Sequence, residues 1–374
     1  MTTGTQFLIG DDKPYESSSL RNLHGRYREL ANGGAVTNRE KSPAVFQALY
    51  GLRLASNVAI PGLSVLPNAD GIADIQVRLN QSPSPLSATV SPSEIFYVSR
   101  ITDANGVPVL RAAMLAGGTH LALLYCDGTR FTLDRNGHEV FADWPDELTL
   151  EDASSYLVGP VLGLVLRLRG IFPLHASAVS IGDHAIALMG PAGAGKSTTA
   201  AGFARCGYRV ISDDVVALSQ QDTRFVIPAG YPRVNLWAES VQALFGADVN
   251  LPLISPAWDK HFMPLDRDRQ FETRSLPLGA IYILHRRERG LAKPIVEEMS
   301  AREAFFALLG NTYMNHLLDP TMRRREFETL GGVVAQVPLR RVRAAADSSM
   351  LPDLCKAIAA DTEKLLWDGG MWRL

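Results

Sequence analysis

The spacing of hydrophobic and polar residues changes near residue 150. Before that point the runs are short and alternate; in DIQVRLN, residues 74–80, Ile75, Val77 and Leu79 fall on one face, as in a half-buried strand. Turn-forming pairs recur between such runs and supply the positive φ angles of tight hairpins: Asn105-Gly106, Gly117-Gly118, Asp127-Gly128 and Asn136-Gly137. The pattern predicts an antiparallel, β-rich amino-terminal domain over residues 44–150, with recognition or scaffolding as its default role.

The segments on either side of this domain have different patterns. Residues 1–43 are polar and lack a sustained period, which predicts a loosely ordered tail. A helix is expected to begin after Thr149, because Glu151 and Asp152 suit the positive first turn of a helix, and to run to Gly170. This helix links the β-rich domain to a second domain, residues 151–374, in which strands and helices alternate.

Two apolar runs, PLHASAVSI (173–181) and HAIALMG (184–190), follow the linking helix. They are separated by Gly182-Asp183, a pair suited to a two-residue hairpin turn. If Ile181 faces His184, the same register places His175 opposite Gly190. The pattern therefore predicts that His175 lies beside whatever site Gly190 begins.

A phosphate-binding loop begins at Gly190, where GPAGAGKS matches the pattern G-x-x-x-x-G-K-S. Its glycines allow backbone N–H groups to surround phosphates, Lys196 reaches the β- and γ-phosphates, and Ser197 offers a hydroxyl to Mg²⁺. An apolar strand enters the loop and a helical run leaves it, so the context predicts binding of ATP with Mg²⁺. The expected binding residues are Gly190, Ala192, Gly193, Ala194, Gly195, Lys196, Ser197 and Thr198.

Two adjacent aspartates follow shortly after this loop. The helix from Ser197 is expected to stop at Gly207, and YRVIS, residues 208–212, reads as a strand that ends at Asp213 and Asp214. In a right-handed β-α-β unit that strand end lies beside the phosphate loop. One carboxylate can hold Mg²⁺ and the other can accept a proton from an attacking hydroxyl; alternatively, one of them only caps a turn. The short gap from Lys196 favours a kinase over motor and switch NTPases.

The later part of the chain offers weaker signals. Arg233 or Lys260 could neutralise γ-phosphate charge, although an exposed or salt-bridged position suits each equally well. Ser300 and Glu303 form a capping box for a helix whose aromatic residues, Phe305, Phe306 and Tyr313, are expected in the core. A further helix is expected from Asp319-Pro320 to Gly331-Gly332, and GAIYIL, residues 279–284, is expected to form a buried strand.

Composition and charge exclude several classes of partner. The 37 basic and 39 acidic residues nearly cancel, and no basic block interleaved with aromatics suggests nucleic-acid binding. The longest apolar run, residues 156–166, is far shorter than the roughly 20 residues of a spanning helix, and no signal peptide is recognisable. Three widely separated cysteines suit a reducing compartment. A cytoplasmic protein without membrane contacts is expected.

Residues 173–218 resemble the catalytic domain of the HPr serine kinase/phosphorylase family, which has a histidine on the preceding strand, a phosphate loop and an aspartate pair soon after it. The resemblance is strong over 171–219 and weaker to about 360. It implies that His175 and Asp213 assist proton transfer and that Asp214 and Ser197 lie by the metal. The loop ends GKSTT, whereas the bacterial HPr enzymes have an acidic residue after the serine, and the downstream signature of that family is absent.

Taken over its whole length, the chain looks more like the HPr-kinase-related proteins associated with lasso-peptide biosynthesis, some of which modify a serine of a precursor peptide. The expected fold is α/β, a P-loop kinase domain of the HPr-kinase type over 151–374 behind the β-rich domain. The expected catalytic residues are Asp213, His175 and Lys196, with Ser197 and Asp214 at the metal. The expected acceptor is a serine of a peptide or small protein. A regulatory or assembly ATPase, a small-molecule kinase and a homo-oligomer stay open.

Overall fold

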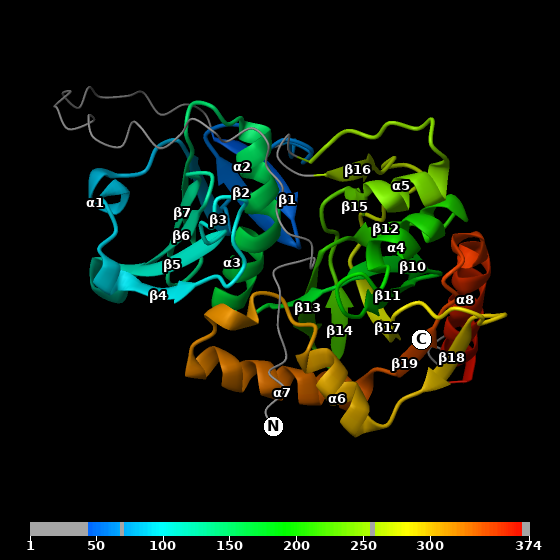
Figure 1. Cartoon of the computed structure of the whole chain (residues 1–374). Helices are drawn as coiled ribbons and strands as arrows, with labels where there is room; N and C mark the ends of the chain where they lie inside the picture. Colours follow the sequence, from blue (N-terminus) through cyan, green and yellow to red (C-terminus); the bar gives the residue numbers. More distant parts are fainter. Residues whose placement is uncertain (1–43, 68–70, 255–258, 369–374) are drawn as a thin grey trace.

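The computed structural model describes residues 44–67, 71–254 and 259–368, and it has a mixed α/β fold built on two large sheets (Figure 1). The predicted tail over residues 1–43 lies outside the described residues. In the described part, no helix is both long and apolar enough to cross a membrane.

The first sheet has eight strands in the order β1-β2-β3-β8-β7-β6-β5-β4. Ile75, Val77 and Leu79 are buried as their alternation predicts, and the predicted glycine turns join β5 to β6, β6 to β7 and β7 to β8. The antiparallel prediction is wrong at β3, which runs parallel to both of its neighbours, because residues 57–74 rather than a tight turn precede it. The strands are β1 (Val45–Leu49), β2 (Leu52–Ser56), β3 (Ile75–Leu79), β4 (Ile95–Val98), β5 (Leu110–Leu115), β6 (His120–Tyr125), β7 (Arg130–Asp134) and β8 (Glu139–Asp143).

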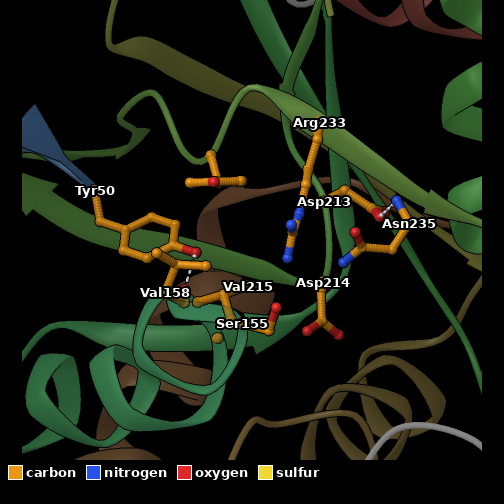
Figure 2. A pocket seen from close by; sticks show the side chains of 10 residues that line it. Tyr50, Ser155, Val158, Asp213, Asp214, Val215, Arg233 and Asn235 are labelled. Atoms are coloured by element: carbon orange, nitrogen blue, oxygen red, sulfur yellow. Dashed lines mark hydrogen bonds between the residues drawn. The ribbon is translucent and has the colours of Figure 1, made fainter. Parts of the chain in front are cut away.

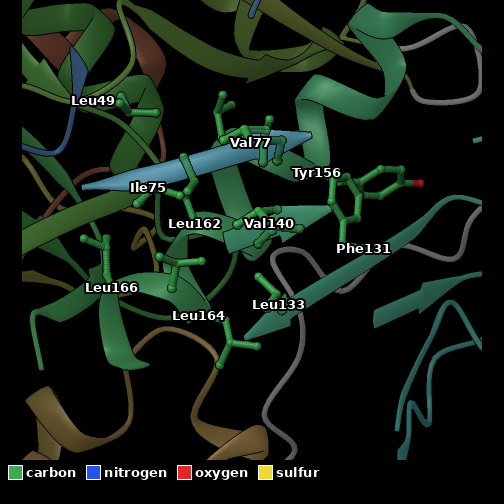
Figure 3. Packing of buried hydrophobic residues seen from close by; sticks show 14 of the residues in the cluster. Leu49, Ile75, Val77, Phe131, Leu133, Val140, Tyr156, Leu162, Leu164 and Leu166 are labelled. Carbon is green, nitrogen blue, oxygen red and sulfur yellow. The ribbon is translucent and has the colours of Figure 1, made fainter. Parts of the chain in front are cut away.

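The linking helix packs its apolar side on this sheet, as Figure 3 shows for Tyr156, Leu162 and Val140. Thr149 caps it as predicted and forms a capping box with Asp152. The helix has three parts, because its middle turn is a wider π-helical segment containing Pro160, whose nitrogen cannot donate a hydrogen bond. The parts are α2 (Leu150–Tyr156), η4 (Leu157–Val161) and α3 (Leu162–Leu168).

The apolar core of the first sheet continues past the linking helix. Val215, Ala217 and Met314, which belong to the second half of the chain, lie in the same buried cluster as residues of the eight strands. The two halves therefore share a core where they meet, and this junction positions the candidate site.

The second sheet has nine strands, with the path β12-β10-β11-β17-β14-β13-β9 and β19 joined to β17 and β18. The predicted strand at residues 279–284 forms the end of β17. The strands are β9 (Phe172–His175), β10 (Ser177–Ile181), β11 (His184–Met189), β12 (Val210–Ser212), β13 (Val215–Gln221), β14 (Arg224–Ile227), β17 (Leu276–Leu284), β18 (Ile295–Glu298) and β19 (Leu339–Arg343). A separate two-stranded antiparallel sheet pairs β15 (Arg233–Trp237) with β16 (Lys260–Pro264).

Helices cover both faces of the second sheet (Figure 1). One buried cluster joins its strands to α4 (Lys196–Arg205), α5 (Ala238–Phe245) and α8 (Leu351–Asp368), and another joins them to α6 (Ala301–Leu309) and α7 (Pro320–Gln336). Gly207 ends α4 with a left-handed φ of 89°, as predicted.

The predictions for the carboxy-terminal helices are partly confirmed. The capping box at Ser300 and the cap at Asp319 are confirmed. The predicted end of α7 at Gly331-Gly332 is wrong, because buried contacts of Leu330 and Val333 carry the helix on to Gln336. The core prediction is wrong for Phe306, which is 61% exposed, whereas Phe305 is partly buried against the core.

The hairpin prediction is half confirmed. β10 and β11 pair in the expected register, from Ile181 opposite His184 to Ser177 opposite Leu188. His175 nevertheless lies opposite Val215 of β13 rather than Gly190, so that part of the prediction is wrong. The reason is a break at Ala176, where the chain leaves β11 and joins another strand.

Candidate active site

Two bends in neighbouring strands create the centre of the candidate site. One chain segment bends at Ala176, between β9 and β10, and its antiparallel partner bends at Asp213 and Asp214, between β12 and β13. Asp214 has a φ of 71°, a left-handed conformation that costs free energy for a residue other than glycine and that clusters at functional sites. The bends turn both carboxylates out of the regular ladder.

Asp213 is held on several sides. Its Oδ1 accepts a hydrogen bond from the Ser177 hydroxyl at 2.6 Å, and its Oδ2 accepts one from the backbone N–H of Asn235 at 2.8 Å. The side chain of Ser197 is near enough to this carboxyl group to help lower the pKa of Asp213. Burial raises the pKa of Asp213, and these hydrogen bonds partly oppose the rise because they favour the charged form. Asp213 is thus fixed next to the serine of the glycine-rich loop.

Asp214 has different neighbours. Its Oδ1 lies 3.5 Å from Nε2 of His175, and its Oδ2 accepts a hydrogen bond from the Tyr313 hydroxyl at 3.3 Å. Its side chain is 26% exposed, whereas Asp213 as a whole residue is 5% exposed. Asp214 therefore faces accessible space together with a second proton-carrying group, the imidazole.

Tyr313 was expected to lie on a helix and to pack in the protein core. It instead follows the end of α6 and lies at the site. Burial raises the pKa of its phenol well above the usual value, so the hydroxyl stays protonated and can donate to Asp214. Its ring packs against Gly163 so closely that a Cβ there would lie 2.7 Å from the ring. Nε of Arg167 donates to the backbone carbonyl of Tyr313 at 2.7 Å, and Arg167 pairs with Glu326 at 3.0 Å.

The glycine-rich loop connects β11 to α4, the strand–loop–helix order that the sequence predicts. Gly190 and Gly195 have φ values of 148° and 93°, and a Cβ on Gly190 would lie 2.3 Å from the Leu284 carbonyl oxygen. Nζ of Lys196 donates to the carbonyl oxygen of Gly190 at 3.0 Å. The loop is therefore a tight backbone structure that a larger residue at Gly190 would disrupt.

The remaining predicted loop residues divide by exposure. Gly193 is exposed at the tip and Ala192 is partly exposed, whereas Ala194 is buried. The hydroxyl of Thr198 is 3.0 Å from that of Ser240 on α5, so this side chain faces the neighbouring helix.

The donor chemistry of this arrangement fits a nucleoside triphosphate with Mg²⁺. The loop presents the start of α4 and the buried Lys196, both of which favour a bound anion. The hydroxyl of Ser197 and the carboxylate of Asp213 are neighbouring hard oxygen donors, a set that Mg²⁺ accepts alongside phosphate oxygens and water. In the part of the chain that the structure describes, no group of three or more Asp, Glu, Cys or His side chains could hold a metal ion.

A pocket opens beside the aspartates, as Figure 2 shows. Both halves of the chain contribute to it: Tyr50 comes from the turn between β1 and β2, and Ser155 comes from the linking helix. Tyr50 also has a left-handed φ, of 55°, and its hydroxyl donates to the Val158 carbonyl at 2.7 Å. The residues that line the pocket are Tyr50, Ser155, Val158, Gly159, Asp213, Asp214, Val215, Tyr231, Arg233 and Asn235.

Arg233 lines this pocket. Lys260, the other basic residue proposed from the sequence to neutralise γ-phosphate charge, is not among the lining residues. The ammonium of Lys260 lies 5.4 Å from the centre of the Trp237 ring, one strand away. Sequence reasoning missed Tyr50, Ser155, Ser177, Asn235 and the site role of Tyr313. No motif marks these residues, since each reaches the site only through the pairing of distant segments.

Comparisons with known proteins give little further guidance. No family model matches this chain, and no curated protein matches it. Among solved structures, it is similar to one described as the Hpr(Ser) kinase/phosphatase from Coxiella burnetii, at 13% sequence identity over 51% of this chain and 98% of that chain, with a TM-score of 0.26. At this TM-score and sequence identity, the similarity supports no conclusion about the function of the site.

Proposed function

We propose that this protein is an ATP- and Mg²⁺-dependent kinase that transfers the γ-phosphate to a hydroxyl group, with a serine of a peptide or small protein as the acceptor. The observation that carries this proposal is the meeting of three elements: the glycine-rich loop, the aspartate pair with His175, and a pocket beside them. A kinase needs these parts, namely a phosphate cradle, a proton acceptor and a space for the acceptor.

In this proposal the glycine-rich loop and the start of α4 bind the phosphates. Backbone N–H groups and Lys196 hold the negative charge, and Lys196 exchanges its contact with the Gly190 carbonyl for phosphate oxygens. Ser197 and Asp213 hold Mg²⁺, which when bound supplies neutralisation of the phosphate charge.

Asp214, paired with His175, accepts the proton of the attacking hydroxyl. This division reverses the one expected from the sequence, in which Asp213 accepted the proton and Asp214 met the metal. Two observations support the reversal: Asp213 is the carboxylate whose pKa the loop serine affects, whereas Asp214 pairs with His175 and is more exposed. A proton acceptor must lie within reach of the acceptor hydroxyl, and the accessible carboxylate meets that condition better.

The pocket is the proposed entry for the acceptor hydroxyl. It lies on the Asp214 side, and Tyr50 and Ser155 bring the β-rich half into its wall. That half would then help to select the acceptor. The resemblance to kinases of lasso-peptide biosynthesis makes a ribosomal precursor peptide the first candidate.

The experiment that tests this proposal is incubation of the purified protein with labelled ATP, Mg²⁺ and peptides encoded beside its gene, followed by mass spectrometry. The expected result is a peptide whose mass has increased by one phosphate group on a serine. ATP turnover that yields only inorganic phosphate with every peptide would instead identify an ATPase. The absence of ATP binding would refute the proposal as a whole.

A further inference from the structure

Arg233 is a cation whose charge is not matched by a direct ionic partner. It begins β15 and extends into the pocket, toward the space that Tyr50 also faces (Figure 2). Among the residues that the structure describes, no carboxylate lies within ion-pair distance of its guanidinium, and its close contacts are the rings of Tyr231 and Phe262, at 4.7 and 5.3 Å. A guanidinium withdrawn from water requires an anion to recover the lost hydration.

Arg167 provides the contrast within the same protein. Arg167 is buried whereas Arg233 is half-buried, and burial lowers the pKa of both; Arg167, however, has Glu326 at 3.0 Å and donates to the Tyr313 carbonyl. Arg167 thus has a charged partner within the fold. Arg233 shows the same burial effect on its pKa, yet its attraction to Asp213 and Asp214 acts across the pocket without contact.

The position of Arg233 is fixed rather than adaptable. Tyr231 is anchored through its hydroxyl, which donates to the Pro61 carbonyl at 2.6 Å, and Phe262 is held in the β15–β16 sheet opposite Asn235. Stacking between these rings keeps the planar guanidinium aimed into the pocket with its N–H groups free to form a fork. Such a fork matches two oxygens of a phosphoryl or carboxylate group.

We propose that Arg233 forms an oxyanion-binding subsite at the junction of the two halves of the chain, separate from the glycine-rich loop. The inference rests on the proposed function and deepens it. The ligand is an anion with two or more equivalent oxygens, and the phosphoryl group in transfer is one source of it. An acidic group carried by the acceptor is the other source.

The test uses inorganic phosphate as the probe and isothermal titration calorimetry as the measurement. Phosphate is titrated into the full chain with and without saturating Mg·ADP, for the wild type, Arg233→Met and Lys260→Met. Arg233→Met keeps most of the side-chain volume and removes the charge. Lys260→Met removes a cation that also stacks on an aromatic ring, from the adjacent strand, and serves as the matched control.

The expected result is that Arg233→Met weakens phosphate binding by roughly 10- to 100-fold, because it loses a charged hydrogen-bond fork. Lys260→Met should bind phosphate as the wild type does. Neither substitution should change the affinity for Mg·ADP. If the ligand is the phosphoryl group in transfer, Mg·ADP strengthens phosphate binding. If it is an acidic group of the acceptor, phosphate binds equally without nucleotide, and Lys196→Ala leaves that binding intact.

Equal phosphate affinity in the wild type and Arg233→Met would overturn the inference, as would a wild type that binds no phosphate under either condition. Failure of the proposed function looks different. In that case Mg·ADP does not bind to the wild type, and the phosphate titrations without nucleotide still decide whether Arg233 is an oxyanion site. Circular dichroism of each variant confirms that its fold is retained.

Discussion

The two sides of the candidate site are built in different ways. The nucleotide side comes from one continuous segment, residues 184–213, in which a strand, a glycine-rich loop, a helix and a second strand follow each other. The acceptor side comes from Tyr50, Ser155, Arg233 and Tyr313, which are far apart in the chain and meet only in the folded protein. The comparison teaches that the general chemistry is encoded locally, whereas the surroundings of Asp214 depend on the whole fold.

The largest effect is expected from Lys196→Ala on the nucleotide side. The ammonium is the only side-chain cation within the glycine-rich loop itself, residues 190–197, so its loss should reduce ATP turnover to background. The thermal unfolding curve should stay close to that of the wild type, because the loop backbone is held by its neighbours. Normal turnover in this variant would remove the loop from the account.

Asp214→Asn should produce the next largest effect, on the acceptor side. The amide keeps the shape of the side chain but cannot accept a proton, so kcat should fall by roughly 10²- to 10⁴-fold. Nucleotide binding, measured with a fluorescent ADP analogue, should be unchanged. A variant that loses nucleotide affinity instead would place Asp214 on the nucleotide side.

Glu326→Gln tests the support behind the acceptor side. It leaves Arg167 buried without its charged partner, which should lower the free energy of unfolding by about 3 kcal/mol. Glu288→Gln, which breaks the partly exposed pair with Arg343, is the matched control and should cost clearly less, because solvent screens that pair. Urea unfolding measures both, and equal losses would mean that the Arg167 pair has no special role.

Tyr313→Phe should have the smallest effect. The ring stays in place against Gly163 and only the hydrogen bond to Asp214 is lost, so kcat should fall about tenfold with KM for ATP unchanged. Tyr282→Phe is the control, since its buried hydroxyl also meets an aspartate, Asp361, but under α8. If both variants retain full kcat, Tyr313 does not position Asp214.

The same contrast explains how much could be predicted from the sequence. The strand, loop, α4 and Gly207 cap follow from local pattern and spacing, and the structure has them where they were expected. The sequence predicted that His175 lies at the site, but as the partner of Gly190. The hairpin register ends at Ala176, and pairing with β13 brings His175 beside Asp214 instead. Spacing alone does not encode such a change of partner strand.

The acceptor side could not be predicted for a related reason. Tyr313 was assigned to the core because aromatic residues usually pack there. It is partly buried against the core, but the loop after α6 turns its hydroxyl to Asp214. The sequence identified Arg233 and Lys260 as equal candidates. Only the pairing of β15 with β16 and the position of the pocket show that Arg233 is the one at the site. The alternating pattern of β3 likewise does not predict whether its neighbouring strands are parallel or antiparallel.

The most direct test of the account is a Mg²⁺ titration of ATP turnover in Asp213→Asn beside Asp214→Asn. The account predicts that Asp213→Asn raises the Mg²⁺ concentration needed for half-maximal turnover and regains part of its activity at high Mg²⁺, because it loses a metal ligand beside Ser197. Asp214→Asn should keep the wild-type Mg²⁺ dependence at a much lower maximum. The opposite assignment, or identical titration curves for the two variants, would contradict the division between a nucleotide side and an acceptor side.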